Sequence, residues 1–462
     1  MTWGSVGTRL LSLTLVLPLI LKKFSAEEIA LWLLFSTIIG LQMLADMGFT
    51  PTFTRVIAYA MGGADCSSLK DTVKKQKTID DTKPNWEAIG HIVVTMRSVY
   101  TKITFLSFFI LAICGTWSLL KPISHVTDTV SAWLAWGIVL LATTIALKGN
   151  IFSSYLQGVN QIALLRRWEI LASLGAIFSS FIILLVGGRL LSLVIANQAW
   201  TILNIFRNRW LCRKVEDGQY KKFTGSVIHR DVFDATWQSA WRSGLGILTG
   251  YGFIQASGIL YAQMSSAANV ASYLLALRFI QAISQFSQAP FYSKLPLLAR
   301  LRAQGDYRQQ IQVAQIGMKR SYWTYIIGFI SVGLFADPLL HMLHSNANFV
   351  SPALWTLLGL AIFAERYGAM HLQLYSTTNH IIWHVANGVT GIIFLIASLA
   401  LIGHIGVYAF PASMLISNIG FYAWYSAGHS YRAYNLHFWS FERSTMILPL
   451  CITFIYAIWT IL

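Results

Sequence analysis

Charged side chains inside apolar stretches are the residues of this chain most able to do chemistry. Five basic residues lie in such stretches, and two acids stand against them: Arg9, Lys148, Arg242, Arg278 and Arg366, with Asp46 and Glu365. An ionised side chain near the centre of a bilayer costs on the order of 3 kcal/mol unless it faces water or a partner. A cavity lined by these groups would be electropositive and would favour a phosphate or pyrophosphate anion.

For these basic residues, a purely structural role is the alternative to a role in the cavity. Lys148 falls in the last turn of its stretch, where a long side chain reaches the interface. Arg242 lies near the start of its stretch, and both interpretations stay open. Arg9 and Arg278 lie deeper, which favours a cavity role.

The two acids are candidates for ion coupling, because a lone acid in a half-dry cavity can take up a proton or a cation. Glu365 and Arg366 are adjacent on one helix, so their side chains diverge by about 100° and need not pair with each other. An ion pair of Glu365 with another helix is the alternative. For Asp46, the alternative is a helix-ending turn pinned by Asp46 and Gly48 before Pro51.

The elements that position these residues are membrane-spanning helices. The 462-residue chain is 55% hydrophobic and 11% charged, too apolar for a set of water-soluble domains. Since one span needs roughly 20 apolar residues, the chain offers about thirteen. They are predicted at 4–21, 28–50, 91–120, 129–152, 168–187, 190–211, 237–262, 266–290, 319–336, 350–374, 381–402, 406–427 and 443–462.

Basic residues fix the orientation. With the amino terminus in the cytoplasm, most of the 34 Lys and Arg residues fall in inward loops, as the positive-inside rule requires. The carboxyl terminus is then predicted outside. This distribution accounts for the net charge of +16 without a nucleic-acid partner.

An internal repeat predicts two halves. Residues 26–34 (AEEIALWLL) align with residues 267–275 (AANVASYLL), and a weaker echo pairs Asn160-Gln161-Ile162 with Asn379-His380-Ile381. Two similar lobes are a known transporter plan, with a cavity that opens to each face in turn. We predict an all-α polytopic membrane protein of 12–13 spans in two pseudo-symmetric six-helix lobes around a central cavity. The lobes are 1–211 and 237–427, joined by a cytoplasmic linker at 212–236, with an extra carboxyl-terminal helix at 428–462.

No catalytic constellation is apparent. The eleven histidines are spread singly, and His341 with His344 has no obvious acidic or cysteine companion at metal-ligand spacing. No serine or cysteine has an activating motif. A membrane glycosyltransferase, polymerase or ligase would need a large loop or an acid cluster, so an enzyme is the weaker alternative.

The amino-terminal third resembles a known family. Arg9, residues 26–32 and the segment Leu44-Ala45-Asp46-Met47-Gly48-Phe49-Thr50-Pro51 through Arg55 resemble the start of the polysaccharide-export (Wzx-type) flippases. The turn at residues 156–161 (LQGVNQ) looks like that family too. These flippases belong to a superfamily of two-lobed exporters that also contains multidrug exporters and lipid II flippases. The thirteenth helix and the cytosolic insert at 65–85 depart from the family pattern.

The resemblance implies a function. It implies translocation of an undecaprenyl-pyrophosphate-linked oligosaccharide across the bacterial inner membrane, for O-antigen, capsule or exopolysaccharide. Lipid-linked oligosaccharide, membrane lipid and other polysaccharide-assembly proteins are the implied partners. Substrate contacts would come from arginines, here Arg9, Arg55 and Arg278. No cofactor is expected beyond a coupling proton or sodium ion. A multidrug exporter of the same architecture is the main alternative, although it should carry an acidic cavity.

Overall fold

The computed structural model describes residues 11–63, 84–247, 252–378, 380 and 382–461. Over these residues the chain is helical and contains no strand, which confirms the predicted all-α class. Arg9, Asn379, Ile381 and nearly all of the insert at 65–85 lie outside the described residues. The chain divides into two compact units, Met1–Ile247 and Leu248–Leu462, and the division falls within the span predicted at 237–262.

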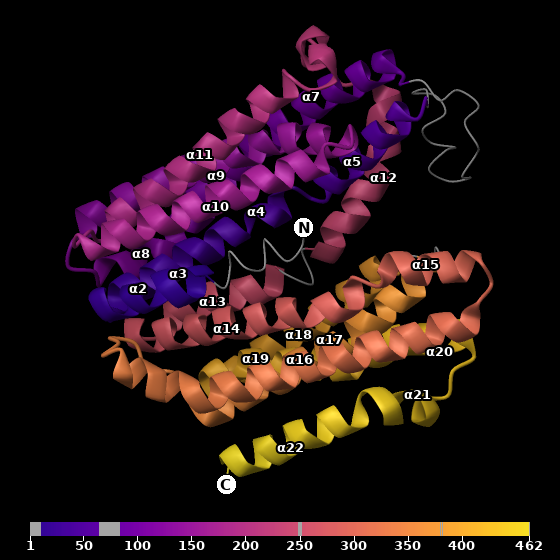
Figure 1. Ribbon diagram of the computed structural model, residues 1–462. Coiled ribbons are helices and arrows are strands. Elements are labelled where there is room, and N and C mark those ends of the chain that lie inside the picture. Colours follow the sequence, from indigo (N-terminus) through magenta and orange to yellow (C-terminus); the bar gives the residue numbers. More distant parts are fainter. Residues whose placement is uncertain (1–10, 64–83, 248–251, 379, 381, 462) are drawn as a thin grey trace. The chain divides into compact units, whose positions relative to one another are not determined.

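The first unit consists of long helices connected by short turns (Figure 1). Its elements are η1 (Ser12–Val16), α2 (Leu17–Lys23), α3 (Ala26–Gly40), α4 (Gln42–Ala45), α5 (Phe49–Met61), α7 (Trp86–Ile110), η2 (Leu111–Gly115), α8 (Thr116–Ser124), α9 (Thr129–Gly158), α10 (Ile162–Leu185), α11 (Leu190–Cys212), η3 (Glu216–Lys222) and α12 (Arg230–Ile247). Helix α9 is central, because α5, α7, α10 and α11 all pack against it. The buried side chains of Phe53, Tyr100 and Tyr155 belong to the core that these helices share.

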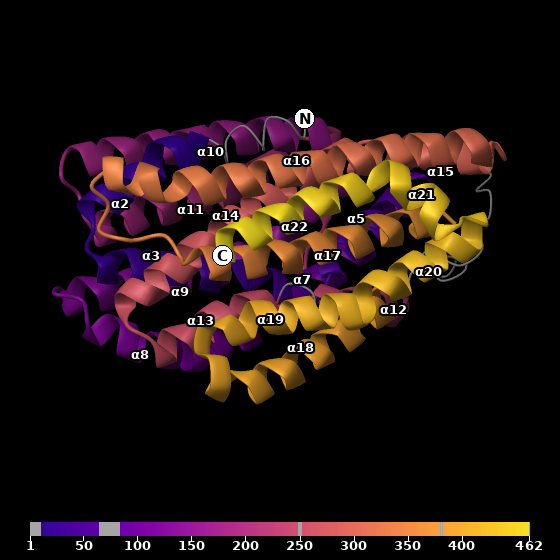
Figure 2. The same cartoon turned by 90° about the horizontal axis from the view of Figure 1, so that it is seen from below.

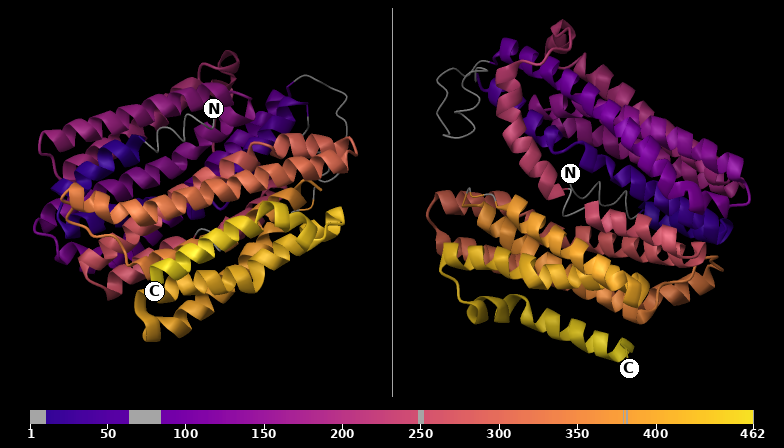
Figure 3. Two further views of the ribbon diagram at one scale, coloured as in Figure 1. Left: turned by 60° about the horizontal axis from the view of Figure 1, so that its bottom comes forward. Right: turned by 180° about the vertical axis from the view of Figure 1, so that it is seen from behind.

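The second unit is built in the same manner (Figure 2). Its elements are α13 (Phe253–Met264), α14 (Ala267–Tyr292), α15 (Leu295–Ala303), α16 (Tyr307–Met342), α17 (Pro352–Ser376), α18 (Trp383–Ile405), η5 (Gly406–Tyr408), α19 (Ala409–Ser417), η6 (Asn418–Tyr422), α20 (Ala423–Tyr434), α21 (Phe438–Thr445) and α22 (Ile447–Ile461). Helix α17 packs against α14, α16, α19, α20 and α22. Figure 3 shows the bend between α21 and α22, which measures 62°.

The repeat seen in the sequence is visible at matching helix starts. Ser25 precedes α3, and Ser266, at the aligned position, precedes α14; both serines have extended backbone conformations. Ser25 forms a capping box, in which its hydroxyl accepts from the amide of Glu28 and the Glu28 carboxylate accepts from the amide of Ser25. Ser266 makes no such side-chain cap. The two hairpins therefore begin alike but are stabilised differently.

Seven described helices are long and apolar enough to cross a membrane, or up to eight if the bent pair α21–α22 is one span. Of the remaining predicted spans, those at 4–21 and 237–262 include residues outside the described ranges. The span predicted at 28–50 is interrupted between α3 and α5, and α17 is long enough but not apolar enough to qualify. The stretch Trp383–Tyr434 is one continuous candidate of 52 residues, which would be about 78 Å long as a straight helix.

The chain turns back within that stretch, at Gly406. There φ is 55° and ψ is −129°, a conformation that favours glycine, and α18 packs against α19 beyond it. The two spans predicted at 381–402 and 406–427 therefore correspond to α18 and to the run from α19 to α20.

Candidate functional site

An interrupted helix forms the centre of the candidate site in the first unit. After α3 the chain makes only the short α4, and Met47 and Gly48 then adopt left-handed conformations with φ of 47° and 72°. Helix α5 starts directly afterwards. Non-helical backbone inside a span is tolerated where protein or a cavity satisfies its polar groups, and interrupted helices often form transporter binding sites.

The carboxylate of Asp46 bonds to three helices around this break. Its Oδ1 accepts from the Thr50 hydroxyl at 2.6 Å, the Tyr100 hydroxyl of α7 at 2.7 Å and the Asn150 amide of α9 at 3.1 Å. Its Oδ2 accepts from the backbone amide of Thr50 at 3.0 Å, in the first turn of α5. The side chain is 7% exposed. Asp46 thus does pin a helix turn, as the structural alternative proposed, and it also connects α5 to α7 and α9.

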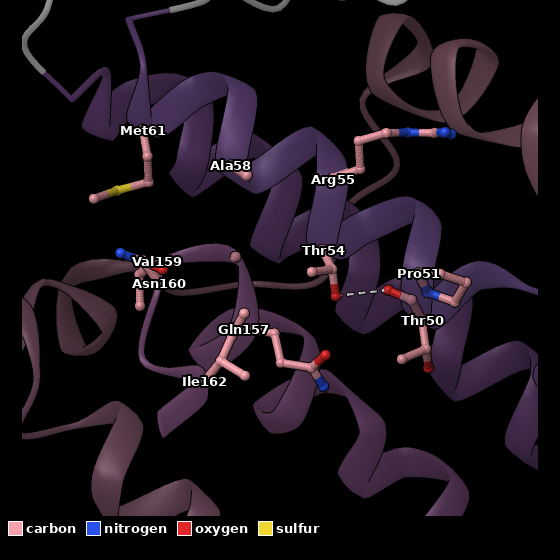
Figure 4. A pocket seen from close by; sticks show the side chains of 11 residues that line it. Thr50, Pro51, Thr54, Arg55, Ala58, Met61, Gln157, Val159, Asn160 and Ile162 are labelled. Carbon is pink, nitrogen blue, oxygen red and sulfur yellow. Dashed lines mark hydrogen bonds between the residues drawn. The ribbon is translucent and has the colours of Figure 1, made fainter. Parts of the chain in front are cut away.

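A pocket of about 510 Å³ lies beside this cluster (Figure 4). It is lined by one face of α5 and by the turn from α9 to α10: Thr50, Pro51, Thr54, Arg55, Ala58, Met61, Gln157, Gly158, Val159, Asn160 and Ile162. Its volume is within the range usual for small-molecule sites. Thr50 belongs both to the pocket and to the Asp46 cluster. A ligand in the pocket would therefore contact a residue that is bonded to the buried carboxylate.

The polar groups of the pocket are mostly neutral. Gln157 and Asn160 contribute amides from the α9–α10 turn, and Thr54 donates its hydroxyl to the Thr50 carbonyl at 2.9 Å. Figure 4 shows the guanidinium of Arg55 pointing away from Gln157 and Asn160, so its stem forms part of the wall. Neutral amides and hydroxyls can hydrogen-bond sugar hydroxyls or phosphate esters.

Two further predicted basic residues of this unit are described, namely Lys148 on α9, which is exposed, and Arg242 on α12. Arg242 is exposed, and its guanidinium carbon lies 5.8 Å from the ring centroid of Trp241. Helix α12 packs on the helix break, because a Cβ on Gly244 would lie 3.0 Å from the Cα and carbonyl oxygen of Met47. Arg242 is therefore on an element that contacts the break, while Arg9 lies outside the described residues.

In the second unit, Arg366 is buried and surrounded by polar groups. It is 1% exposed, donates from Nη2 to the Ser284 hydroxyl of α14, and pairs with Glu365 at 3.3 Å. When the side-chain amide of Gln288 is oriented with its oxygen toward Arg366, that oxygen accepts from Nη1 of Arg366 at 3.2 Å and from Nη2 at 3.0 Å. The adjacent Glu365 and Arg366 do meet, because the long arginine side chain bends back to reach its neighbour. Contact with a substrate would require Arg366 to leave these partners.

The remaining predicted arginine also lies on α14. Arg278 is half-buried and precedes Ser284 by six residues, about 9 Å along the helix axis. Helix α14 packs against α17. The structure thus places Arg278 and Arg366 on neighbouring helices of one unit.

Two polar clusters could not be found from the sequence. Tyr100 and Asn150, the partners of Asp46, are uncharged residues far along the chain, and no sequence signal pointed to them. The second cluster joins His371 of α17 to Glu442 of α21 at 2.9 Å, and both side chains are 0% exposed. The prediction that His341 has no acidic companion is wrong. Its Nε2 lies 3.6 Å from a carboxylate oxygen of Asp337, one helical turn earlier. Among the described residues, no group of three or more His, Cys, Asp or Glu side chains could hold a metal ion.

Comparison with known proteins places the fold. No protein-family model and no curated protein matches the sequence. Among solved structures, lipid II flippase MurJ in an inward-closed conformation matches with a TM-score of 0.62 and 13% identity, over 98% of this chain and 91% of that one.

Multidrug transporters match almost as well. An inward-facing MATE family transporter of the MOP superfamily has a TM-score of 0.61 at 13% identity, over 92% of this chain and 98% of that one. The Vibrio cholerae MATE transporter VcmN in its bent form has a TM-score of 0.50 at 14% identity, over 94% and 99%. The chain therefore has the helical membrane-transporter fold that the MurJ flippase and the MATE transporters share.

Proposed function

We propose that this protein moves an undecaprenyl-pyrophosphate-linked oligosaccharide from the cytoplasmic to the periplasmic leaflet of a bacterial inner membrane, for cell-surface polysaccharide. The observation that carries this proposal is the match to a lipid II flippase along nearly the whole chain. The excess of basic over acidic residues in the predicted spans adds to it, because the lipid carrier bears a pyrophosphate. The protein acts as a transporter and not as an enzyme.

The proposed mechanism uses arginines as phosphate ligands. Arg9, Arg55, Arg242, Arg278 and Arg366 are the proposed set, because a guanidinium can donate two parallel hydrogen bonds to a phosphate. The amides and hydroxyls of the pocket beside α5 would hold sugar hydroxyls. The transporter would open first to the cytoplasm and then to the periplasm.

Coupling to an ion is proposed at Asp46 and Glu365, with a proton or sodium as the driving ion. Protonation of Asp46 would convert one of its acceptor oxygens into a donor, and the four hydrogen bonds that it accepts could not all persist. Such a change would loosen α5 from α7 and α9, next to the pocket. The site could therefore transmit its charge state to the substrate.

Deletion of the gene in its native host tests the substrate. Lipid-linked intermediates are extracted and the surface glycan is profiled, with a plasmid-borne copy as the control. Accumulation of undecaprenyl-linked oligosaccharide together with loss of surface glycan is expected. An unchanged glycan profile would reject the proposal.

A multidrug exporter is the second candidate. It is favoured by the nearly equal match to an inward-facing MATE transporter and by the buried carboxylate of Asp46. The same deletion strain distinguishes the two functions, because loss of an exporter would leave the glycan intact and make the cells sensitive to cationic drugs.

A further inference from the structure

The second unit contains a buried cluster that the proposed transport path does not use. His371 on α17 and Glu442 on α21 lie with Nε2 and Oε1 2.9 Å apart, and both side chains are fully buried. Glu442 accepts two more hydrogen bonds, from the Tyr431 hydroxyl at 2.8 Å and from the Thr445 hydroxyl at 2.6 Å. A carboxyl group that accepts from three donors is held in its ionised form.

The other nitrogen of His371 determines the charge of the cluster. Because Nε2 donates to an ionised Glu442, Nδ1 is either bare or protonated, and it has no hydrogen-bond partner. Rings surround the imidazole, with centroids 4.7 Å away at Tyr367, 5.0 Å at Tyr431 and 5.7 Å at Phe441. A bare Nδ1 leaves a net charge of −1 on the pair, whereas a protonated Nδ1 leaves none.

The side chains packed directly around the pair are mostly aromatic. Within the described ranges, His371 is the only basic side chain within ion-pair distance of Glu442. The titratable groups that face the pair are tyrosines: Tyr322 from α16, Tyr367 from α17 and Tyr431 from α20. Neutral tyrosines cannot balance a carboxylate, and a lone buried charge costs several kcal/mol. Uptake of one proton removes that cost.

Hydroxyl groups hold the carboxylate end of the cluster. The Tyr431 hydroxyl donates to Glu442 and lies 2.7 Å from the Tyr367 hydroxyl, and the Tyr431 side chain is partly exposed. These hydroxyls end at the carboxylate, so a proton reaches Nδ1 only when the packing around the imidazole opens locally.

From this geometry we infer that His371 and Glu442 form a proton-binding site, in which one exchangeable proton neutralises the pair and secures α21 to α17. Loss of the proton leaves a buried negative charge between the two helices. The site responds to pH whatever the substrate of the transporter is, so it does not rest on the proposed function.

Nitrogen NMR of the full-length protein, labelled with 15N-histidine and reconstituted in lipid, tests the inference. A doubly protonated imidazole and a neutral one give distinct pairs of nitrogen signals, and His371→Asn identifies the signals of His371. At pH 5.5 we expect two protonated nitrogens on His371 in the wild type. Glu442→Gln should convert this residue to the neutral form at the same pH, because the counter-charge is gone.

Glu87→Gln is the matched control, since Glu87 is an exposed residue in the first turn of α7, and it should leave the His371 signals unchanged. If His371→Asn does not fold, the nearly isosteric Glu442→Gln still identifies the His371 signals. They are the signals that shift in Glu442→Gln but not in Glu87→Gln. A neutral His371 in the wild type at pH 5.5, or a doubly protonated one in Glu442→Gln, would overturn the inference. Neither readout depends on transport.

Discussion

Asp46 shows how one side chain can serve both as a helix cap and as the centre of a site. Two of its four hydrogen bonds come from Thr50, four residues later, and the other two come from Tyr100 and Asn150 on separate helices. The first pair fits the helix-ending turn that the sequence predicts at Asp46 and Gly48. The second pair gives the residue its connection to the rest of the unit.

Asp46→Asn should reduce transport at least tenfold and lower stability by about 1–3 kcal/mol, because the amide nitrogen cannot accept the bonds that one carboxylate oxygen accepts now. Glycan export in the complemented deletion strain and the thermal midpoint of the purified protein measure the two effects. Asp337→Asn on α16 is the matched control, since that carboxylate is 57% exposed. Full export by Asp46→Asn would remove Asp46 from the mechanism.

Arg278→Ala should abolish glycan export while leaving expression intact, since the proposed phosphate ligand is lost. Arg278→Lys should retain part of the activity, because lysine keeps the charge but not the paired donors. The exposed Arg320 on α16 provides a control, Arg320→Ala, which should export normally. Normal output from Arg278→Ala would contradict the proposed role.

Elements of the first unit are held together by close backbone contacts as well as by polar ones. A Cβ on Gly158, at the end of α9, would lie 2.5 Å from the Ile57 side chain and 3.2 Å from the carbonyl oxygen of Thr54 on α5. This contact forms one wall of the pocket. The position of the wall thus depends on the absence of a side chain at residue 158.

Gly158→Ala should therefore destabilise the protein by about 1–3 kcal/mol, because the added methyl group forces α5 and α9 apart. Gly388→Ala on α18 is the control: apart from its own stretch of helix, nothing lies within 4 Å of a Cβ built there, and alanine favours the helix. Thermal midpoints of the two variants in detergent give the comparison. Equal midpoints would mean that the α5–α9 contact is loose.

The linker before α12 is also tied to α7. The His229 ring stacks on His91 at 4.1 Å between centroids, and Arg97 donates to the Phe223 carbonyl at 2.6 Å. Burial, followed by the nearby His91, lowers the pKa of His229 below its usual value. The detached linker therefore binds a proton more readily than the docked one, and docking weakens as the pH falls below about 6.5.

Hydrogen exchange of residues 223–229 should accordingly be faster at pH 5.5 than at pH 7.5, after correction for the intrinsic effect of pH on exchange. In His229→Gln the corrected difference should shrink, since glutamine carries no titrating proton. A pH difference of the same size in this variant would assign the effect to other groups.

For the whole molecule, charge distribution predicts an orientation. Most basic residues fall in loops on the side of the amino terminus, so that side should be cytoplasmic. Because the α18–α20 stretch turns back at Gly406, the chain then makes one further pass through α21 and α22 if this bent pair is a span. The carboxyl terminus would lie in the periplasm.

Fusions at the carboxyl terminus test this orientation. Alkaline phosphatase fused after Leu462 should be active, because the enzyme folds only outside the cytoplasm, and a green fluorescent protein fused there should be dark. The opposite pattern would show that α21–α22 lies along one face of the membrane without crossing it.

The sequence by itself determined the all-helical membrane class and the identity of the rare charges in apolar stretches, and it predicted a two-fold repeat. These features follow from local composition and spacing, because a bilayer demands long apolar helices and penalises each buried charge. Which charges meet which partners was decided by tertiary packing. Asp46 meets Tyr100 and Asn150, Arg366 meets Ser284 and Gln288, and His371 meets Glu442. Such partners are mostly neutral residues. Their pairing depends on the rotation of each helix about its axis and on the position of the break at Gly48. Hydrophobic periodicity does not specify either feature to within one residue.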